Sequence, residues 1–255
     1  MSAYDFLAGF YDTFQQGLDP IAWADFVDRI VKKYNVLSGD GDKGRLLLCD
    51  LGCGTGAVSC AFSDLGYDVI GVDSSSAMLD QARSRCGKRK ILWLCQDMAE
   101  LDLFGTMDVF VSLLDTVNHI TSKKDIEKLL RSFYCFLNPG GLFIFDLATK
   151  KHFEKTLGNE FFYSIEDDFT VLWENDFDEK KGLNTASLTM FASAGKELFE
   201  RQDAEIVERY YSDEEIRALV EKCHLEVVGV YGDMKMRRPN ENDERVFYII
   251  RRPLI

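Results

Sequence analysis

The chain of 255 residues lacks several features that would assign it to a special class of protein. It contains no apolar run long enough to span a bilayer, and no basic-then-apolar segment near its start that would indicate a secretion signal. Its 30 basic residues stand against 43 acidic ones, which gives a formal net charge of -13. A nucleic acid partner requires a basic footprint, so this balance argues against one. We therefore expect a cytoplasmic protein that does not bind a membrane.

Metal-binding and disulfide patterns are missing as well. None of the seven cysteines forms a C-x-x-C pair, and the three histidines, at 119, 152 and 224, are scattered. Zinc sites need clustered ligands, so we predict no metal site and expect reduced, mostly buried thiols. Hydrophobic residues make up 46% of the chain and charged residues 29%, which is ordinary for a globular protein. The length suffices for one large domain with a smaller lobe.

The first part of the chain alternates between apolar strands and helical patterns. Such alternation implies right-handed crossovers and a mainly parallel sheet. The residues Asn138 to Gly141, with the sequence NPGG, are expected to break the chain before the fifth strand. Strands are predicted at 46–50, 67–72, 91–94, 107–114 and 142–147, and an amphipathic helix precedes them at 23–34.

The pattern changes between about 161 and 209, where strand-like segments follow one another without a helix. We predict strands at 161–165, 169–177, 185–192 and 198–207, forming an antiparallel sheet inserted into the α/β domain. After the insertion, Ser212 and Glu215 form a capping box for another helix, and two closing strands follow at 225–231 and 245–250. The predicted organisation is therefore one domain made of residues 1–150 and 210–255, with residues 151–209 as an inserted lid or substrate subdomain.

A glycine-rich turn is the most informative motif. The stretch LLLCDLGCGTG, residues 46–56, leads from a strand through Gly52, Gly54 and Gly56 into a helical pattern. Glycine lets backbone N–H groups approach a ligand where a Cβ atom would block them. Asp50 ends the strand, where its carboxylate can accept hydrogen bonds from an ammonium or hydroxyl group. A strand end and a helix N-terminus together form a cofactor cradle.

Two further carboxylates narrow the choice of cofactor. Asp73 ends the second predicted strand and is suited to the hydroxyls of a ribose, in NAD and S-adenosylmethionine alike. Asp97 follows the third strand, where it can accept from an adenine amino group. A dinucleotide would bring its pyrophosphate to the glycine turn, and Asp50 would repel it. These residues favour S-adenosylmethionine, with an NAD-dependent oxidoreductase as the rival interpretation.

The string CDLGCGTG, with Asp73 and the sequence QDM at 96–98 downstream, resembles the signature of class I S-adenosylmethionine-dependent methyltransferases. The segment LDTVNHI at 114–120 and the late β-insertion resemble most an uncharacterised bacterial branch with small-molecule acceptors. That branch commonly has tyrosine where this chain has His119. The resemblance implies a Rossmann-like, mostly parallel seven-stranded sheet with an antiparallel last strand and helices on both faces, plus the inserted antiparallel β lid.

The resemblance also implies where the cofactor would bind. The residues at the methionine end and the ribose would be Asp50, Gly52, Cys53, Gly54 and Asp73. The residues around the adenosine, the sulfonium and the N-terminal cover would be Ser74, Met78, Asp97, Met98, Leu113, Asp115, Tyr11 and Trp23. Several have a plain structural alternative, because strand-end aspartates cap helices, and Met78 and Trp23 fit a hydrophobic core.

The acceptor end is predicted from the loop after the fourth strand and from the insertion. Asp115 and His119 are candidate catalytic groups, with His119 suited to act as a base near neutral pH, whereas Asn118 and His119 could instead cap the local structure. Trp173 and Arg209 are candidate substrate-binding residues of the insertion. An arginine there would suit a carboxylate or phosphate acceptor, and a solvent-facing arginine is the alternative.

We therefore predict methyl transfer from S-adenosylmethionine to a small molecule by in-line displacement. RNA or protein methylation, NAD-dependent oxidoreduction and non-catalytic S-adenosylmethionine binding stay open as alternatives. The sequence does not determine the oligomeric state, and a homodimer is one of the states left open.

Overall fold

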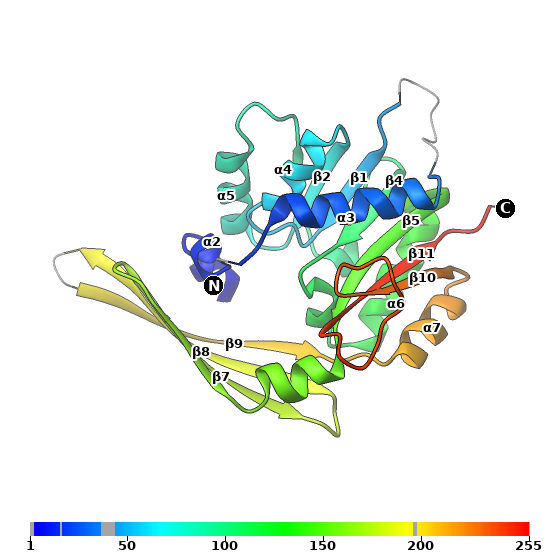
Figure 1. The fold of residues 1–255 in the computed structure, drawn as a ribbon. Coiled ribbons are helices and arrows are strands. Elements are labelled where there is room, and N and C mark those ends of the chain that lie inside the picture. Colours follow the sequence, from blue (N-terminus) through cyan, green and yellow to red (C-terminus); the bar gives the residue numbers. More distant parts are fainter. Residues whose placement is uncertain (1–2, 16, 37–43, 196–197, 255) are drawn as a thin grey trace.

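The computed structural model describes residues 3–15, 17–36, 44–195 and 198–254, and it contains two separate β-sheets (Figure 1). The larger has seven strands in the order β10-β11-β5-β4-β1-β2-β3. The first five strands pair in parallel, whereas β11 runs antiparallel to both neighbours. The predicted Rossmann-like sheet with an antiparallel last strand is therefore confirmed. Its strands are β1 (Leu47–Leu51), β2 (Asp68–Asp73), β3 (Leu92–Cys95), β4 (Met107–Ser112), β5 (Leu137–Ala148), β10 (Glu226–Gly232) and β11 (Arg245–Arg251).

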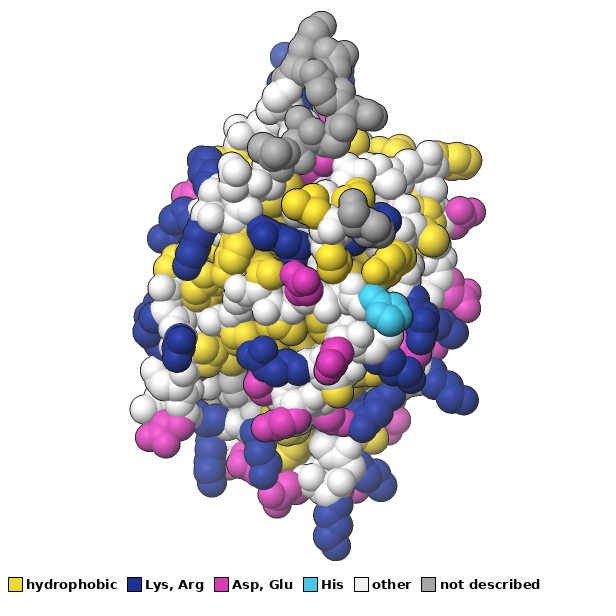
Figure 2. Space-filling view, turned by 90° about the vertical axis from the view of Figure 1, so that its right-hand side faces the viewer, with side chains coloured by type: hydrophobic (Ala, Val, Ile, Leu, Met, Phe, Trp, Pro, Cys, Tyr) yellow, Lys and Arg dark blue, Asp and Glu magenta, His cyan; other side chains and the backbone are white. Residues whose placement is uncertain are grey.

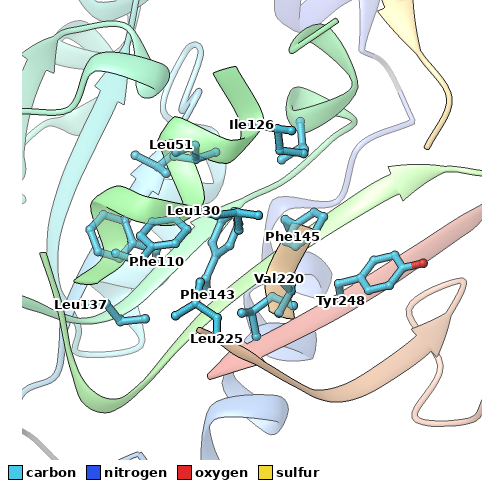
Figure 3. Close-up of a cluster of buried hydrophobic side chains, with 14 of the residues drawn as sticks. Leu51, Phe110, Ile126, Leu130, Leu137, Phe143, Phe145, Val220, Leu225 and Tyr248 are labelled. Atoms are coloured by element: carbon cyan, nitrogen blue, oxygen red, sulfur yellow. The ribbon is translucent and has the colours of Figure 1, made fainter. Parts of the chain in front are cut away.

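Helices cover both faces of this sheet because successive strand residues point to opposite sides. On β5, Phe143 and Phe145 pack toward α6 (Lys123–Phe136) and α7 (Asp213–Lys222), whereas Ile144 packs toward α3 (Pro20–Lys33) and α4 (Ala57–Asp64). Figure 3 shows the first of these clusters, in which Phe110, Phe143 and Leu130 fill the space between sheet and helix. α5 (Ser76–Cys86) follows β2. None of the helices formed by the described residues is long and apolar enough to cross a bilayer.

The second sheet is an antiparallel arm that projects from the main body (Figure 1). It consists of β6 (Phe161–Ile165), β7 (Phe169–Asp178), β8 (Leu183–Gly195) and β9 (Leu198–Arg209), which confirms the predicted antiparallel insertion. A wide helical turn that the sequence did not indicate, η3 (His152–Leu157), leads into it. One face packs on α1 (Ala3–Leu7) and α2 (Tyr11–Phe14), with Leu7, Val171 and Met190 at the centre of the contact.

The predicted break at Asn138 to Gly141 is wrong, because these residues belong to β5. The pairing register to β4 slips between Met107 and Val109, so the strand continues through an irregularity of the bulge type. The backbone stays satisfied there, since the Gly140 N–H donates to the Arg252 carbonyl at 2.8 Å. Gly140 has a φ of +81°, a conformation that glycine adopts without strain. The proline and glycines thus shape a strand rather than end it.

Candidate cofactor and acceptor site

The glycine turn between β1 and α4 is folded back on the second strand. The N–H groups of Gly52 and Cys53 both donate to the Val72 carbonyl, at 2.7 and 3.0 Å. Gly52 has a φ of +69°, and a Cβ atom built there would lie 2.2 Å from Cγ2 of Thr116. The positive φ and the nearby Thr116 side chain therefore both require glycine at position 52. At Gly54, a Cβ atom would point toward the Tyr11 ring, which lies 3.9 Å away across the cavity.

Asp73 connects this turn to the next helix. Its Oδ2 accepts a hydrogen bond from the Gly54 N–H and its Oδ1 accepts one from the Ser75 N–H, both at 2.8 Å. Burial raises the pKa of the carboxyl, and the two backbone donors oppose that shift. Each carboxylate oxygen keeps a further lone pair, so the group can still accept from the hydroxyls of a ribose. The backbone thus positions Asp73 before any ligand binds.

A cavity opens above the carboxyl ends of the parallel strands, the position where open α/β sheets bind ligands. The loops after β1, β2, β3 and β4 form its floor, and the N-terminal helices close it. Its lining consists of Tyr4, Tyr11, Gly52, Gly54, Asp73, Ser74, Met78, Gln96, Asp97, Met98, Leu114, Thr116, His119 and Ile120. Nine residues predicted from the sequence are brought together here: Tyr11, Gly52, Gly54, Asp73, Ser74, Met78, Asp97, Met98 and His119.

The N-terminal helices α1 and α2 are attached to the cofactor side of the cavity by hydrogen bonds. The Ser75 hydroxyl donates to Asp5 at 2.7 Å, and the Thr55 hydroxyl donates to Asp12 at 2.8 Å. Both contacts are made by residues next to the glycine turn or to the start of α5. Tyr4 and Tyr11 are thereby held over the cavity. The sequence indicated Tyr11 but not Tyr4.

Asp97 caps a short helix and also lines the cavity. Its Oδ1 accepts from the Ala99 N–H at 2.8 Å at the start of this helix, η1 (Met98–Glu100). The preceding Gln96 holds the loop by two side-chain hydrogen bonds to the backbone of Asp102. The carboxylate that would recognise adenine is therefore fixed by its own helix cap.

Asp50 lies apart from the cavity wall. It is 3% exposed, and one oxygen accepts a hydrogen bond from the Ser59 hydroxyl on α4. Burial raises the pKa of this carboxyl to about 7, and the hydrogen bond from Ser59 opposes the shift. Of the three carboxylates that we expected to converge, Asp73 and Asp97 line the cavity and Asp50 does not. Contact between Asp50 and a methionine ammonium stays a prediction.

Four more of the predicted cofactor residues do not line the cavity, namely Cys53, Leu113, Trp23 and Asp115. Leu113 packs into the cluster under α3 and α4. Leu114 lines the cavity in place of Leu113, because Leu114 and Asp115 both have a φ of 62° and redirect the chain after β4. Trp23 is 8% exposed in the same cluster, with the Arg245 guanidinium over its ring at 5.3 Å. Trp23 therefore packs in the hydrophobic core, which was the structural alternative to cofactor binding.

Asp115 is held in a buried ion-pair network that the sequence did not indicate. Arg245 binds Asp115, with Nη2 to Oδ2 at 2.8 Å, and also binds Asp146 on the neighbouring strand β5. Asp146 is fully buried, which raises its pKa to about 6, although Arg245 opposes the shift. The charge of Asp115 is compensated by Arg245, and its catalytic role stays a prediction. Its carboxylate positions the loop after β4.

His119 lines the cavity and lies against α1 and β9. The Tyr4 hydroxyl lies 3.0 Å from its Nε2, and the Glu208 Oε1 lies 3.8 Å from the same atom. Burial lowers the pKa of His119, opposed by Asp115 and by a hydrogen bond to the Val207 backbone. The ring is therefore neutral at pH 7, with Nε2 free to accept from the Tyr4 hydroxyl. Glu208 was not among the residues that the sequence suggested.

The remaining predicted acceptor residues have structural contacts instead. Asn118 is fully buried, donating to the Arg209 carbonyl at 2.8 Å and accepting from the Ala148 N–H at 3.0 Å. The Arg209 side chain pairs with Glu215 at 3.1 Å. Trp173 stacks on Phe162, with the ring centroids 5.3 Å apart. Asn118, Arg209 and Trp173 do not line the cavity, because each side chain is engaged in contacts with other parts of the chain.

The sheet order, the glycine turn and the carboxylates at the strand ends define a Rossmann-like protein that binds a nucleoside cofactor. Residues 48–141 match a protein family described as "Methyltransferase domain". The chain is 28% identical over 209 residues to "Putative methyltransferase YqeM" of Bacillus subtilis, covering 81% of this chain and 83% of that protein. It is 24% identical over 251 residues to "Putative methyltransferase GWCH70_2453" of a Geobacillus species, covering 98% and 99% of the two chains.

A solved structure extends this likeness to the whole fold. The crystal structure of an S-adenosylmethionine-dependent methyltransferase from Clostridium acetobutylicum superposes with a TM-score of 0.84 and 26% identity. The likeness covers 99% of this chain and 100% of that one. The chain belongs to the class I S-adenosylmethionine-dependent methyltransferases, as its motifs predicted, and its cofactor is S-adenosylmethionine. When bound, this cofactor supplies an electrophilic methyl group on a positively charged sulfur.

Proposed function

We propose that the chain methylates a small molecule that enters between the cofactor cavity and the antiparallel arm. The observation that carries this proposal is the joint wall formed by Tyr4 and His119. Tyr4 belongs to the N-terminal cover and His119 to the loop after β4, and β9 of the arm lies directly behind them. An enclosed end of this kind favours a compact acceptor over a polymer.

Each part of the site has a distinct task in this proposal. Asp73 would hold the ribose and Asp97 the adenine, while Gly54 leaves room for the cofactor beside Tyr11. The Tyr4–His119 pair would orient the acceptor atom in line with the methyl group. In-line displacement needs orientation and exclusion of water more than strong acid or base groups.

We further propose that residues 151–209 serve as the acceptor lid. The inner face of the arm packs on α1 and α2 rather than on the large sheet, so a movement of the N-terminal cover would open the acceptor end. The surface also favours a small acceptor. On the face shown in Figure 2, lysine and arginine side chains are interspersed with carboxylates and do not form one continuous basic patch.

Relatives with named activities support the same class of acceptor. "Glycine/sarcosine N-methyltransferase" of Halorhodospira halochloris is 32% identical over 141 residues, covering 48% of this chain and 53% of that protein. A "Ubiquinone biosynthesis O-methyltransferase" of a Bradyrhizobium species is 31% identical over 119 residues, covering 46% and 43%. Both names point to small molecules, one methylated at nitrogen and one at oxygen.

Transfer of labelled methyl groups tests this proposal. The purified chain would be incubated with methyl-labelled S-adenosylmethionine and a panel of small amines, alcohols and carboxylates, with RNA and an unrelated protein as parallel acceptors. We expect label in at least one small molecule, and none in the same reaction with Asp73→Ala. Label only in RNA or protein would contradict the proposal. Cofactor binding without any transfer would favour a non-catalytic binding protein.

A further inference from the structure

We infer that the methyl acceptor is an amine and that Glu208 is the anionic group that selects it. This inference rests on the proposed function, because it names the acceptor class of the same site. It depends on three observations, namely the position of Glu208, the absence of a cation paired with it and the use of the nearby arginines elsewhere.

Glu208 lies on the inner side of β9 next to His119, and it does not itself line the cofactor cavity. Its side chain is 16% exposed, and Oε1 approaches His119 Nε2 to 3.8 Å. Its cross-strand partner on β8 is Asn184, which is fully buried and hydrogen-bonds to Glu208. A carboxylate in such a position would ordinarily be neutralised by a lysine or arginine.

Among the described residues, no lysine or arginine lies within 4.0 Å of the Glu208 carboxylate. His119 cannot replace one, because burial keeps its ring neutral. The Glu208 carboxylate therefore has no lysine or arginine partner within 4.0 Å in the described part of the chain. A ligand that carries N–H groups and a positive charge would pair with it.

The two arginines nearest this end are already paired. Arg245 is enclosed by Asp115 and Asp146, and Arg209 points away to Glu215 and to the Thr121 carbonyl. The Nη atoms of both guanidiniums are thus engaged, and the Arg209 Nε, which has no partner in the described part of the chain, is buried. The sequence suggested an anionic acceptor bound by an arginine. We infer a cationic acceptor instead, because the unpaired charge at this end is negative.

The chemistry of an amine fits these groups. Burial raises the pKa of the Glu208 carboxyl to about 7, so near neutral pH it can take a proton from an incoming ammonium. The freed nitrogen lone pair then forms the bond to the methyl carbon, while the electron pair of the carbon–sulfur bond goes to sulfur. The products are the thioether S-adenosylhomocysteine and a methylated ammonium. The positive charge moves from sulfur to nitrogen, and Glu208 releases its proton to water before it can accept another.

Binding of size-matched probes tests the inference without knowledge of the true acceptor. Cyclohexylamine, cyclohexanol and cyclohexanecarboxylate would be titrated into the chain loaded with S-adenosylhomocysteine, and their dissociation constants measured by ligand-observed NMR. The variant is Glu208→Gln, which keeps the shape and removes the charge. The matched control is Glu205→Gln, which removes the same charge from an exposed position on the same strand. Circular dichroism and S-adenosylhomocysteine affinity confirm that each variant is folded.

We expect the wild-type chain and Glu205→Gln to bind the amine at least about tenfold more tightly than the alcohol or the carboxylate, and Glu208→Gln to lose this preference. Tightest binding of the carboxylate, equal binding of all three probes, or an unchanged preference in Glu208→Gln would overturn the inference. In those cases methyl transfer to a small alcohol or acid would leave the proposed function standing. Failure of the labelling experiment with every small molecule would instead remove the proposed function.

Discussion

The hydroxyl of Tyr4 hydrogen-bonds to Nε2 of His119 at 3.0 Å, although 115 positions separate the two residues. Their rings meet edge to face, with centroids 5.6 Å apart. This pair joins the N-terminal cover to the loop after β4, so the proposed acceptor end is complete only when the cover is in place.

Replacement of Tyr4 by phenylalanine tests the role of this hydrogen bond. The ring contact with His119 would remain, and only the hydroxyl would be lost. We expect turnover to fall by about tenfold, the effect of one hydrogen bond, with cofactor affinity unchanged. Initial rates and calorimetric binding of S-adenosylhomocysteine provide the two readouts. Tyr163→Phe, at an exposed position of β6, is the control, and equal rates for both variants would contradict the role.

Asp73 is expected to determine cofactor affinity. Asp73→Ala removes the predicted ribose ligand and also leaves two backbone N–H groups without their acceptor. We expect affinity for S-adenosylhomocysteine to fall by about tenfold or more and stability to fall by about 1–3 kcal/mol, with the fold retained. Calorimetry and urea unfolding measure the two effects. The control is Asp68→Ala at the exposed start of the same strand, and affinity loss of the same size there would refute the assignment.

The glycine turn gives a prediction about sterics. Gly52→Ala adds a Cβ atom 2.2 Å from Thr116 Cγ2 at a positive φ, whereas Gly66→Ala has a φ of +98° with nothing within 4 Å. Both variants carry the left-handed backbone cost of about 1–2 kcal/mol, and only Gly52→Ala also carries the clash. We therefore expect Gly52→Ala to unfold at a lower urea concentration than Gly66→Ala. Equal midpoints would mean that Thr116 moves aside freely.

The buried ion-pair network predicts a large loss of stability. Arg245→Met keeps much of the packing on Trp23 but leaves the Asp146 carboxyl buried without a cation. We expect a loss of about 3–5 kcal/mol in urea unfolding, and partial recovery in the double variant Arg245→Met with Asp146→Leu. Arg201→Met, which breaks an exposed pair with Asp203, should cost less than about 1 kcal/mol. Absence of recovery in the double variant would show that packing, not charge, is responsible.

Glu208 also predicts a dependence of stability on pH. Its pKa is raised from 4.5 to about 7 by burial, so the folded chain holds this proton over a range where the unfolded chain has lost it. The associated stability is present below 4.5 and is lost as the pH rises toward 7. Between about pH 5 and about pH 8, Glu208→Gln should therefore gain about 2 kcal/mol relative to the wild type. Unfolding curves of both proteins at the two pH values measure this difference, and a constant difference would contradict the buried, ionising carboxyl.

Local patterns in the sequence were sufficient for the elements and for one half of the site. Strand periodicity predicted the bounds of the strands in both sheets to within a few residues, because the alternation of buried and exposed positions appears directly as a sequence pattern. The glycines at 52, 54 and 56 and the aspartates at 73 and 97 were predictable, since each lies at the end of a strand whose direction the pattern already implies. The break expected at Asn138 failed because bonds to Arg252 and Asp108, distant in sequence, let the strand continue.

The acceptor half was decided by tertiary structure alone. Whether Arg245 or Arg209 is free to bind a ligand depends on which carboxylates lie beside it, and those come from other strands and loops. The positions of Tyr4 and Glu208 against His119 likewise arise from docking the N-terminal cover and the arm onto the sheet. The sequence by itself thus determined the fold class and the nucleoside end of the cavity. The charge at the proposed acceptor end was set only when folding paired some ionisable groups and left Glu208 with no lysine or arginine of the described residues within 4.0 Å.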